Sequence, residues 1–167
     1  MTVALVLLGR EHLPAVRALL DDPDVLRFTR VPEPPPPDFP ETWLELYERG
    51  RRDGTREGFA VVDDGEFLGL ALAPRIEREA RTAELGYIVA PAARGRGVAT
   101  TALRLLTGWA FAELGALRLE LLIGVANDAS KRVAERNGYR LEGVLRSFHL
   151  KQGLREDTEL WSRLPGD

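Results

Sequence analysis

Residues Arg94–Thr100 have the sequence RGRGVAT, which follows a strand-like apolar run at 84–89 and opens a helical pattern that continues to about Leu114. The two glycines let the backbone approach another group closely, because no Cβ stands in the way. The turn leaves the first amides of the helix unpaired at the positive end of the helix dipole, an arrangement that binds phosphate. The two arginines add donors that match phosphate geometry. The stretch therefore predicts a phosphate-binding loop between a strand and a helix.

Three other interpretations of this loop are open at this point. An ordinary turn between a strand and a helix also needs glycine. A P-loop would require a Gly-Lys-Ser/Thr ending, which the stretch lacks. A dinucleotide-binding fingerprint would require a third glycine and an early position in the chain. Here Ala99 follows after only two residues and the loop lies in mid-chain, although Glu120 stands at about the distance of the expected acidic residue.

Composition predicts one globular domain over residues 1–167, with 44% apolar and 29% charged residues. The absence of cysteine excludes disulfides, thiolate metal sites and a cysteine nucleophile, and two histidines argue against a histidine metal site. We therefore expect no metal. A net charge of −3 argues against general nucleic-acid binding. The apolar start at 1–9 is short and has no basic leader, and no run reaches the length of a membrane span, so we expect a cytoplasmic protein without membrane contact.

Hydrophobic periodicity predicts a mixed sheet with helices on both faces. Trp109 and Tyr139 are expected to pack in the core. The proline-rich stretch 31–40 is expected to be a stiff surface loop that can line a cleft, with a docking motif for a proline-reading domain as the alternative. The predicted strands are 2–8, 58–63, 66–73, 84–89, 117–125, 139–150 and 155–164, and the predicted helices are 12–20, 41–52, 98–114 and 128–136.

A second group of polar residues, Asn127-Asp128-Ala129-Ser130, lies one strand beyond the glycine loop. The parallel strands 84–89 and 117–125 must separate where their following helices diverge, and a ligand can insert between them there. Asn127 offers both a donor and an acceptor, which suits an amide-bearing ligand. Its simpler role is to cap the helix at 128–136. The two roles are compatible.

Together these motifs make the chain resemble the GNAT superfamily of acyl-CoA-dependent N-acyltransferases, in particular the branch of ribosomal-protein N-terminal acetyltransferases (RimJ/RimL-type). The resemblance covers about 1–164 in element order. It implies an α/β (mixed α+β) fold whose largely antiparallel sheet is splayed between two parallel strands. The residues that carry it are Arg94-x-x-Gly97-x-Ala99 after Val89-Ala90-Pro91, Asn127-x-x-Ser130 followed by Gly138-Tyr139, Leu141-Glu142-Gly143, and Asp157 before Leu160-Trp161.

The resemblance implies acetyl-CoA as the acyl donor and assigns residues to it. Amides of Gly95–Thr100 would hold the pyrophosphate, and residues 88–90 would pair with the pantetheine arm. Asn127 would bond that arm, Ser130 would lie near the sulfur, and Lys131 or Arg132 could reach the adenosine phosphate. The cofactor-binding residues expected are Ile88, Val89, Ala90, Arg94, Gly95, Arg96, Gly97, Val98, Ala99, Thr100, Asn127, Ser130 and Lys131.

The implied chemistry is direct attack of an amine on the thioester. The ammonium must first lose a proton, and Glu84 is the candidate base, directly or through water. The alternative for Glu84 is an ordinary exposed strand glutamate. Strand amides near Ile88 could stabilise the oxyanion. Many superfamily members have a tyrosine acid where this chain has Ala134, which leaves Ser130 or no residue as the acid. The branch often has a glutamate where this chain has Thr101.

The acceptor predicted from this branch is the α-amine of a protein N-terminus. Small amines (polyamines, amino acids, aminoglycosides) and an acidic acyl group such as succinyl are alternatives. Further alternatives are a CoA-binding regulator without turnover and an interaction domain that uses the proline loop. The acceptor cleft is expected between residues 22–56 and the last hairpin, with Phe28, Phe39 and His149 nearby, and acidic residues of the 22–41 region could attract a cationic amine. A homodimer is a further expectation from the relatives.

Overall fold

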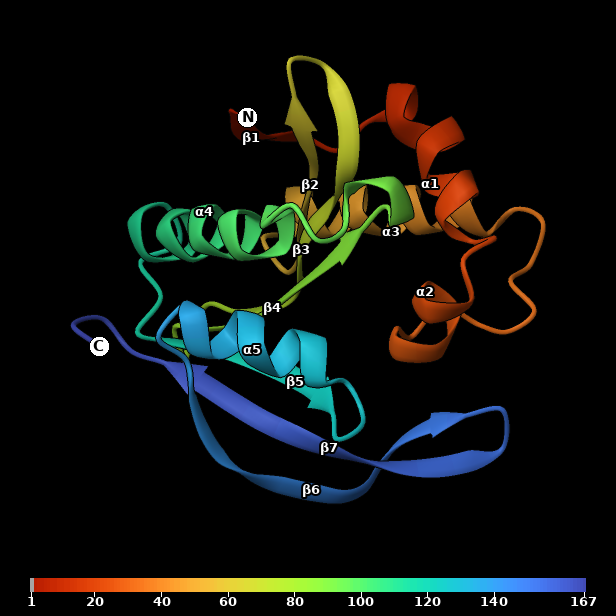
Figure 1. The fold of residues 1–167 in the computed structure, drawn as a ribbon. Coiled ribbons are helices and arrows are strands. Elements are labelled where there is room, and N and C mark those ends of the chain that lie inside the picture. The colour runs from red at the N-terminus through yellow and green to blue at the C-terminus, as the bar shows by residue number, and fades with distance from the viewer. Residues whose placement is uncertain (1) are drawn as a thin grey trace.

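A seven-stranded sheet forms the centre of the structure, a computed structural model that describes residues 2–167 (Figure 1). The strand order is β1-β2-β3-β4-β5-β7-β6, and every neighbouring pair is antiparallel except β4 and β5. The splayed mixed sheet predicted from the sequence is confirmed. The strands are β1 (Val3–Leu7), β2 (Glu57–Asp63), β3 (Glu66–Glu77), β4 (Thr82–Val89), β5 (Arg118–Gly124), β6 (Arg140–Lys151) and β7 (Leu154–Arg163).

Helices cover both faces of this sheet. In Figure 1, α4 and α5 lie on the face towards the viewer, while α3 lies behind the strands. Leu85 of β4 packs in a core cluster with α4, whereas Leu70 and Leu72 of β3 pack in a second cluster with α3. The helical segments are η1 (Arg10–His12), α1 (Leu13–Leu19), α2 (Pro23–Phe28), α3 (Phe39–Asp53), η2 (Pro91–Ala93), α4 (Val98–Ala112) and α5 (Asp128–Arg136).

Helix α2 and strand β3 differ most from the sequence prediction. The short helix α2 was not predicted, although Asp22-Pro23 is a typical helix start, and the Asp22 side chain accepts a hydrogen bond of 2.9 Å from Val25 N. Strand β3 was predicted to end at Ala73 but continues to Glu77. It passes Pro74 because the register shifts between Leu72 and Arg75, which is where a strand tolerates proline.

The parallel pair β4 and β5 separates soon after it begins. Register partners are Thr82 with Arg118, Ala83 with Leu119 and Glu84 with Glu120, and no pair follows within residues 2–167. Beyond this point β4 stays bound to β3, and β5 stays bound to β7 through Gly124. The facing edges of the two strands therefore have unpaired backbone groups at their carboxyl ends, where α/β sheets bind ligands.

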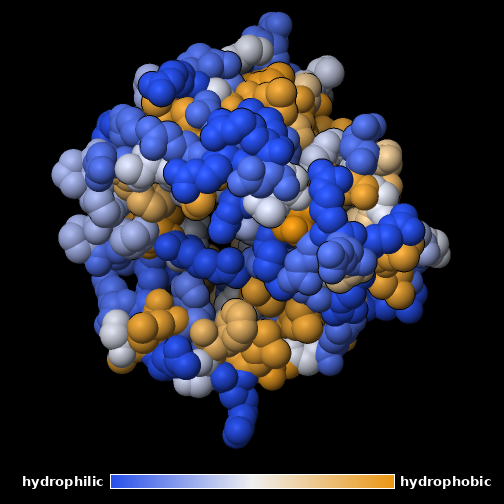
Figure 2. Space-filling view, turned by 180° about the vertical axis from the view of Figure 1, so that it is seen from behind, coloured by the Kyte–Doolittle hydropathy of each residue, from blue (hydrophilic) through white to orange (hydrophobic). Residues whose placement is uncertain are grey.

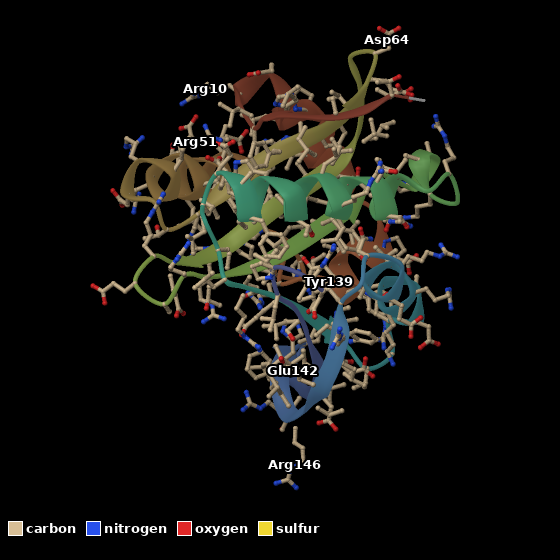
Figure 3. All side chains as sticks on the ribbon, turned by 90° about the vertical axis from the view of Figure 1, so that its left-hand side faces the viewer. Arg10, Arg51, Asp64, Tyr139, Glu142 and Arg146 are labelled. Carbon is tan, nitrogen blue, oxygen red and sulfur yellow. The ribbon has the colours of Figure 1, made fainter. Side chains whose placement is uncertain are left out.

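The last hairpin is tied to the sheet by an ionic contact across β7. Arg118 of β5 donates to Glu142 of β6 at 2.7 and 2.8 Å, and Ser162 of β7 also donates to Glu142. Figure 3 shows Glu142 on this hairpin, Arg146 extending from it into solvent, and Tyr139 nearer the centre of the molecule. The bond from Arg118 is the main reason that the pKa of Glu142 falls from 4.5 to about 2.

We expect Glu142→Gln to destabilise the fold at neutral pH by about 1 kcal/mol, because 40% of the glutamate side chain is exposed and solvent screens the pair. A lowered folded-state pKa stabilises the fold above pH 4.5 and loses this effect as the pH falls towards 2. Urea unfolding of both proteins should therefore give a difference at pH 7 that shrinks between pH 4.5 and 2. A difference independent of pH would contradict the ionic origin.

Candidate functional site

The glycine loop forms an open cradle at the start of α4. Gly95 and Gly97 have φ angles of 74° and 78°, in the left-handed region that favours glycine. Gly97 is the N-cap of α4 and has no side chain to satisfy the first helical amides. A Cβ built on either glycine would meet no atom within 4 Å. The helix therefore presents unpaired donors to open space, and the cradle can accept phosphate oxygens.

The Arg94 side chain is bound to α2. Its guanidinium donates to Asp22 at 2.7 and 3.2 Å and to Asp24 at 3.3 Å, while its Nε donates to Val89 O at 3.3 Å. This hydrogen bond from Arg94 is the main cause that lowers the pKa of Asp22. The side chain thus fastens the cradle to α2, while Arg96 is exposed on the loop.

The expected strand contacts lie at the end of β4. Ile88 and Val89 pair with Leu70 and Gly69 of β3, and Ala90 N donates to Leu68 O at 2.9 Å. Because β4 is paired with β3 on one side, a ligand can pair with it only along the side that faces β5. The strand edge is thus open in the gap between β4 and β5.

Asn127 and Ser130 lie across this gap at the start of α5. Asn127 Oδ1 accepts a hydrogen bond of 3.2 Å from Ser130 N, so the predicted capping role is confirmed. Asn127 Nδ2 donates to no group of residues 2–167 and remains available to a ligand. Lys131 is less available, because its ammonium lies 2.9 Å from Glu159 and 3.6 Å from Asp128. The contact with Glu159 is the main cause that raises the pKa of Lys131.

A tyrosine that the sequence analysis missed faces the same gap. The Tyr87 hydroxyl is buried next to the Ser130 side chain, without a hydrogen bond of standard geometry. Burial raises the pKa of Tyr87 to about 12. By contrast, Tyr139 is buried and its hydroxyl forms a hydrogen bond of 2.8 Å with Thr107, which confirms it as a core residue. Trp109 is partly buried and packs edge-on against Phe59 of the core, so its predicted packing role is confirmed.

Glu84 lies on the other face of β4, because neighbouring strand residues point to opposite faces. It is 6% exposed, so the alternative of an exposed strand glutamate is wrong. Its carboxylate contacts Arg30 Nη2 at 2.7 Å and Arg75 Nε at 3.6 Å. These two partners are 54 and 9 positions away in the sequence, which is why the sequence analysis did not find them.

Glu84 lines a cleft of about 360 Å³. The face of the molecule opposite α4 and α5 is hollowed near its centre, and hydrophilic residues border the hollow (Figure 2). Other residues that line the cleft are Arg30, Thr55, Arg56, Pro74, Arg75 and Ile76. The cleft thus adjoins the last β4 residue that pairs with β5.

The cleft was expected between residues 22–56 and the last hairpin, but the hairpin contributes no residue to its lining. Lys151 donates to Thr29 O at 3.0 Å and also to Val31 O, so the hairpin end contacts the segment after α2. His149 is partly buried, and burial is the main cause that lowers its pKa, with Arg30 as a second cause. Phe39 lines a separate small apolar pocket with Trp43 and Ile88.

Residues 2–167 have neither a metal-binding cluster nor a membrane-spanning helix. No group of three or more histidine, aspartate or glutamate side chains is arranged to hold a metal ion. None of the helices in this part of the chain is long and apolar enough to cross a membrane.

Comparison with known proteins gives consistent matches. Residues 3–140 match the family model described as an acetyltransferase (GNAT) domain. A putative ribosomal N-acetyltransferase, YdaF of Bacillus subtilis, is 34% identical over 126 residues, which are 75% of this chain and 69% of that protein. Spermidine N(1)-acetyltransferase of Escherichia coli is 31% identical over 138 residues, which are 83% of this chain and 73% of that protein. A ribosomal L7/L12 α-N-protein acetyltransferase (RimL), solved with coenzyme A, superposes with a TM-score of 0.89 over 98% of this chain and 94% of that one, at 21% identity.

Proposed function

The chain belongs to the acetyltransferase (GNAT) family, and from this premise we propose how its site moves an acetyl group from acetyl-CoA to a primary amine. The separation of β4 and β5 after Glu84 and Glu120 carries the proposal. The glycine cradle and Ser130 lie towards α4 and α5, whereas Glu84 faces the arginine-lined cleft. Acetyl-CoA and the acceptor amine can therefore approach each other from opposite faces of the sheet.

Acetyl-CoA, the acyl donor, is held by backbone groups and one side chain. Amides of Gly95–Thr100 take the pyrophosphate, and the β4 edge at 88–90 pairs with the pantetheine arm. Asn127 Nδ2 donates to a carbonyl of that arm while its Oδ1 caps α5. The open space above both glycines fits this role. The exposed Arg132 is better placed than the paired Lys131 to reach an adenosine phosphate.

The transfer takes two protons from the nitrogen and gives one to the sulfur. Glu84 takes a proton from the incoming ammonium, directly or through water, and the free amine attacks the thioester carbon. The carbon–sulfur bond then breaks, and the leaving thiolate has a free-thiol pKa of about 8.5, so a weak acid suffices. Ser130 lies at the gap and can donate that proton, while the second proton that the nitrogen loses on forming the amide bond restores the serine hydroxyl, with Tyr87 next to it able to pass a proton on. Ala134 is fully buried and supplies no acid.

Asn127→Asp separates the two roles of this side chain. The aspartate keeps an oxygen to accept from Ser130 N, so we expect the melting temperature to stay within about 2 °C of the parent. The aspartate lacks the hydrogen-bond donor Nδ2 and places a negative charge beside the pantetheine arm of acetyl-CoA. The affinity for acetyl-CoA should therefore fall about tenfold. Calorimetry with CoA and thermal unfolding measure the two effects. Equal CoA affinity would remove Asn127 from the binding site.

Similarity to the ribosomal-type relative supports the α-amine of a protein N-terminus as acceptor. A small-molecule amine is the second candidate, because the spermidine acetyltransferase matches over a longer part of the chain. We place the reaction in the cytoplasm, where a ribosomal acceptor would be met.

Thiol release from acetyl-CoA in the presence of peptide and small-molecule amines tests the proposal. We expect release that depends on the amine. A protein that binds CoA but releases no thiol with any amine would be a regulator and not an enzyme. Succinyl-CoA in place of acetyl-CoA tests the alternative acyl group in the same assay.

A further inference from the structure

The cleft beside Glu84 has a strongly cationic lining. Three of its seven lining residues are arginines, Arg30, Arg56 and Arg75, and Glu84 is the only carboxylate among the seven. Its volume of about 360 Å³ is at the lower end of the range for small-molecule sites. Guanidinium groups bind carboxylate and phosphate in bidentate geometry. The lining is therefore matched to an anionic group in a small ligand or at a chain end.

Arg56 has a guanidinium without an anionic partner. Arg30 contacts Glu84, and Arg75 contacts Glu77, Glu84 and Glu120, whereas Arg56 forms no ion pair within residues 2–167. The Arg56 side chain is only partly exposed and lies beside the buried Tyr47 hydroxyl. The guanidinium can therefore take an anionic group of a ligand as its counter-ion.

The position of Arg56 is fixed by its surroundings. A Cβ on Gly50 would lie 2.4 Å from Arg56 Cβ, so the arginine stem packs directly on α3. Arg56 N and Thr55 N both donate to Gly50 O, and Ile76 N donates to Thr55 O at 2.9 Å. The loop is thus held to both α3 and β3, and the guanidinium is presented from a rigid base.

Binding of the acceptor amine changes the charge balance at Glu84. An ammonium that reaches this carboxylate competes with Arg30, which is 2.7 Å away and has a half-exposed side chain. Arg30 then needs a new counter-ion. An acceptor with its own carboxylate or phosphate supplies one, whereas a polyamine adds only positive charge beside Arg30, Arg56 and Arg75.

We propose that the acceptor of this site is an amine that has a carboxylate or phosphate group a few bonds from the nitrogen, which Arg56 and Arg30 bind while the amine contacts Glu84. This inference rests on the proposed acetyl transfer and narrows its acceptor class. The anionic group can belong to a free small molecule or to an acidic residue that follows a peptide N-terminus.

The test compares matched acceptors with acetyl-CoA as donor. The small-molecule arm pairs β-alanine with β-alaninamide and O-phosphoethanolamine with ethanolamine. The peptide arm pairs C-terminally amidated tetrapeptides with aspartate or asparagine at the second position, and spermidine is a separate acceptor. We expect kcat/KM to be at least about tenfold higher for the anionic member in one arm. The arm that shows the preference identifies whether the anionic group belongs to a free small molecule or to a peptide. Equal rates within every pair, or preference for spermidine, would overturn the inference while leaving acetyl transfer intact.

Arg56→Gln should remove most of this preference. Arg52→Gln is the matched control, because Arg52 is exposed near the end of α3, four residues before Arg56, and lies outside the cleft; this variant should keep the preference. Calorimetric titration of the CoA-loaded protein with the same pairs gives a readout without turnover. Binding that favours the anionic member and depends on Arg56, without thiol release, would support the inference and contradict the proposed reaction. A preference that survives Arg56→Gln would contradict the role of Arg56.

Discussion

Gly97→Val is expected to reduce acetyl-CoA affinity by at least about 100-fold, because it removes several charge-assisted hydrogen bonds at once. The backbone at Gly97 has a φ of 78°, which a β-branched residue adopts only with strain. The new side chain would also occupy the space above the first amides of α4, where nothing lies within 4 Å of an added Cβ. Calorimetry with CoA measures the loss.

Gly65→Val is the matched control for this change. Gly65 has a φ of 81° and an equally open surrounding, but it lies in the turn between β2 and β3. The two variants should therefore lose similar stability, and only Gly97→Val should lose CoA affinity. Similar losses of affinity in both would mean that backbone strain acts through the whole fold and not through the cradle.

Glu84→Gln is expected to lower kcat by about 100-fold or more, with CoA affinity nearly unchanged, because the amide cannot accept the proton of the ammonium. The pH profile of kcat should shift, since the reaction would depend on amine that is already neutral in solution. Initial rates at several pH values, together with CoA titration, measure both effects. An unaltered rate near neutral pH would remove Glu84 from the role of base.

Loss of the ion pairs with Arg30 and Arg75 must be separated from loss of the base. Glu120→Gln is the control, because Glu120 also contacts Arg75, at 3.1 Å, and is the register partner of Glu84 on β5. We expect it to lower the free energy of unfolding and to leave most of kcat. A loss of kcat as large as that of Glu84→Gln would mean that the charge network, and not proton transfer, explains the effect.

Local sequence patterns were enough to predict the strands, the glycine loop and the cap at Asn127. Each of these features depends on residues that are close in the chain. The strands show alternating apolar residues, and the loop has glycines with positive φ before a helix. The cap is an asparagine whose side chain accepts a hydrogen bond from the amide three residues later. The separation of β4 and β5 was predicted as well, and their pairing ends at Glu84 and Glu120, although α4 and α5, which follow these strands, lie on the same face of the sheet.

Side-chain pairs between distant segments were not predictable in this way. Arg94 is adjacent to the cradle in sequence, yet its guanidinium binds Asp22, 72 positions away. The cleft lining is similar, since Arg30, Arg56 and Arg75 come from three separate segments and converge near Glu84. A sequence with many exposed arginines gives no local signal that distinguishes these three. The charge of the cleft beside Glu84 therefore follows only from the structure.

The acetyl group is proposed to pass directly between acetyl-CoA and an amine that are bound on opposite faces of β4. Mass spectrometry of products from isotope-labelled acetyl-CoA and an accepted amine tests it most directly, with the intact protein measured in the same reaction. We predict one labelled acetyl group on the amine for each thiol released, and no label on the protein when the amine is omitted. Label on the protein, or thiol release without an acetylated amine, would contradict the account.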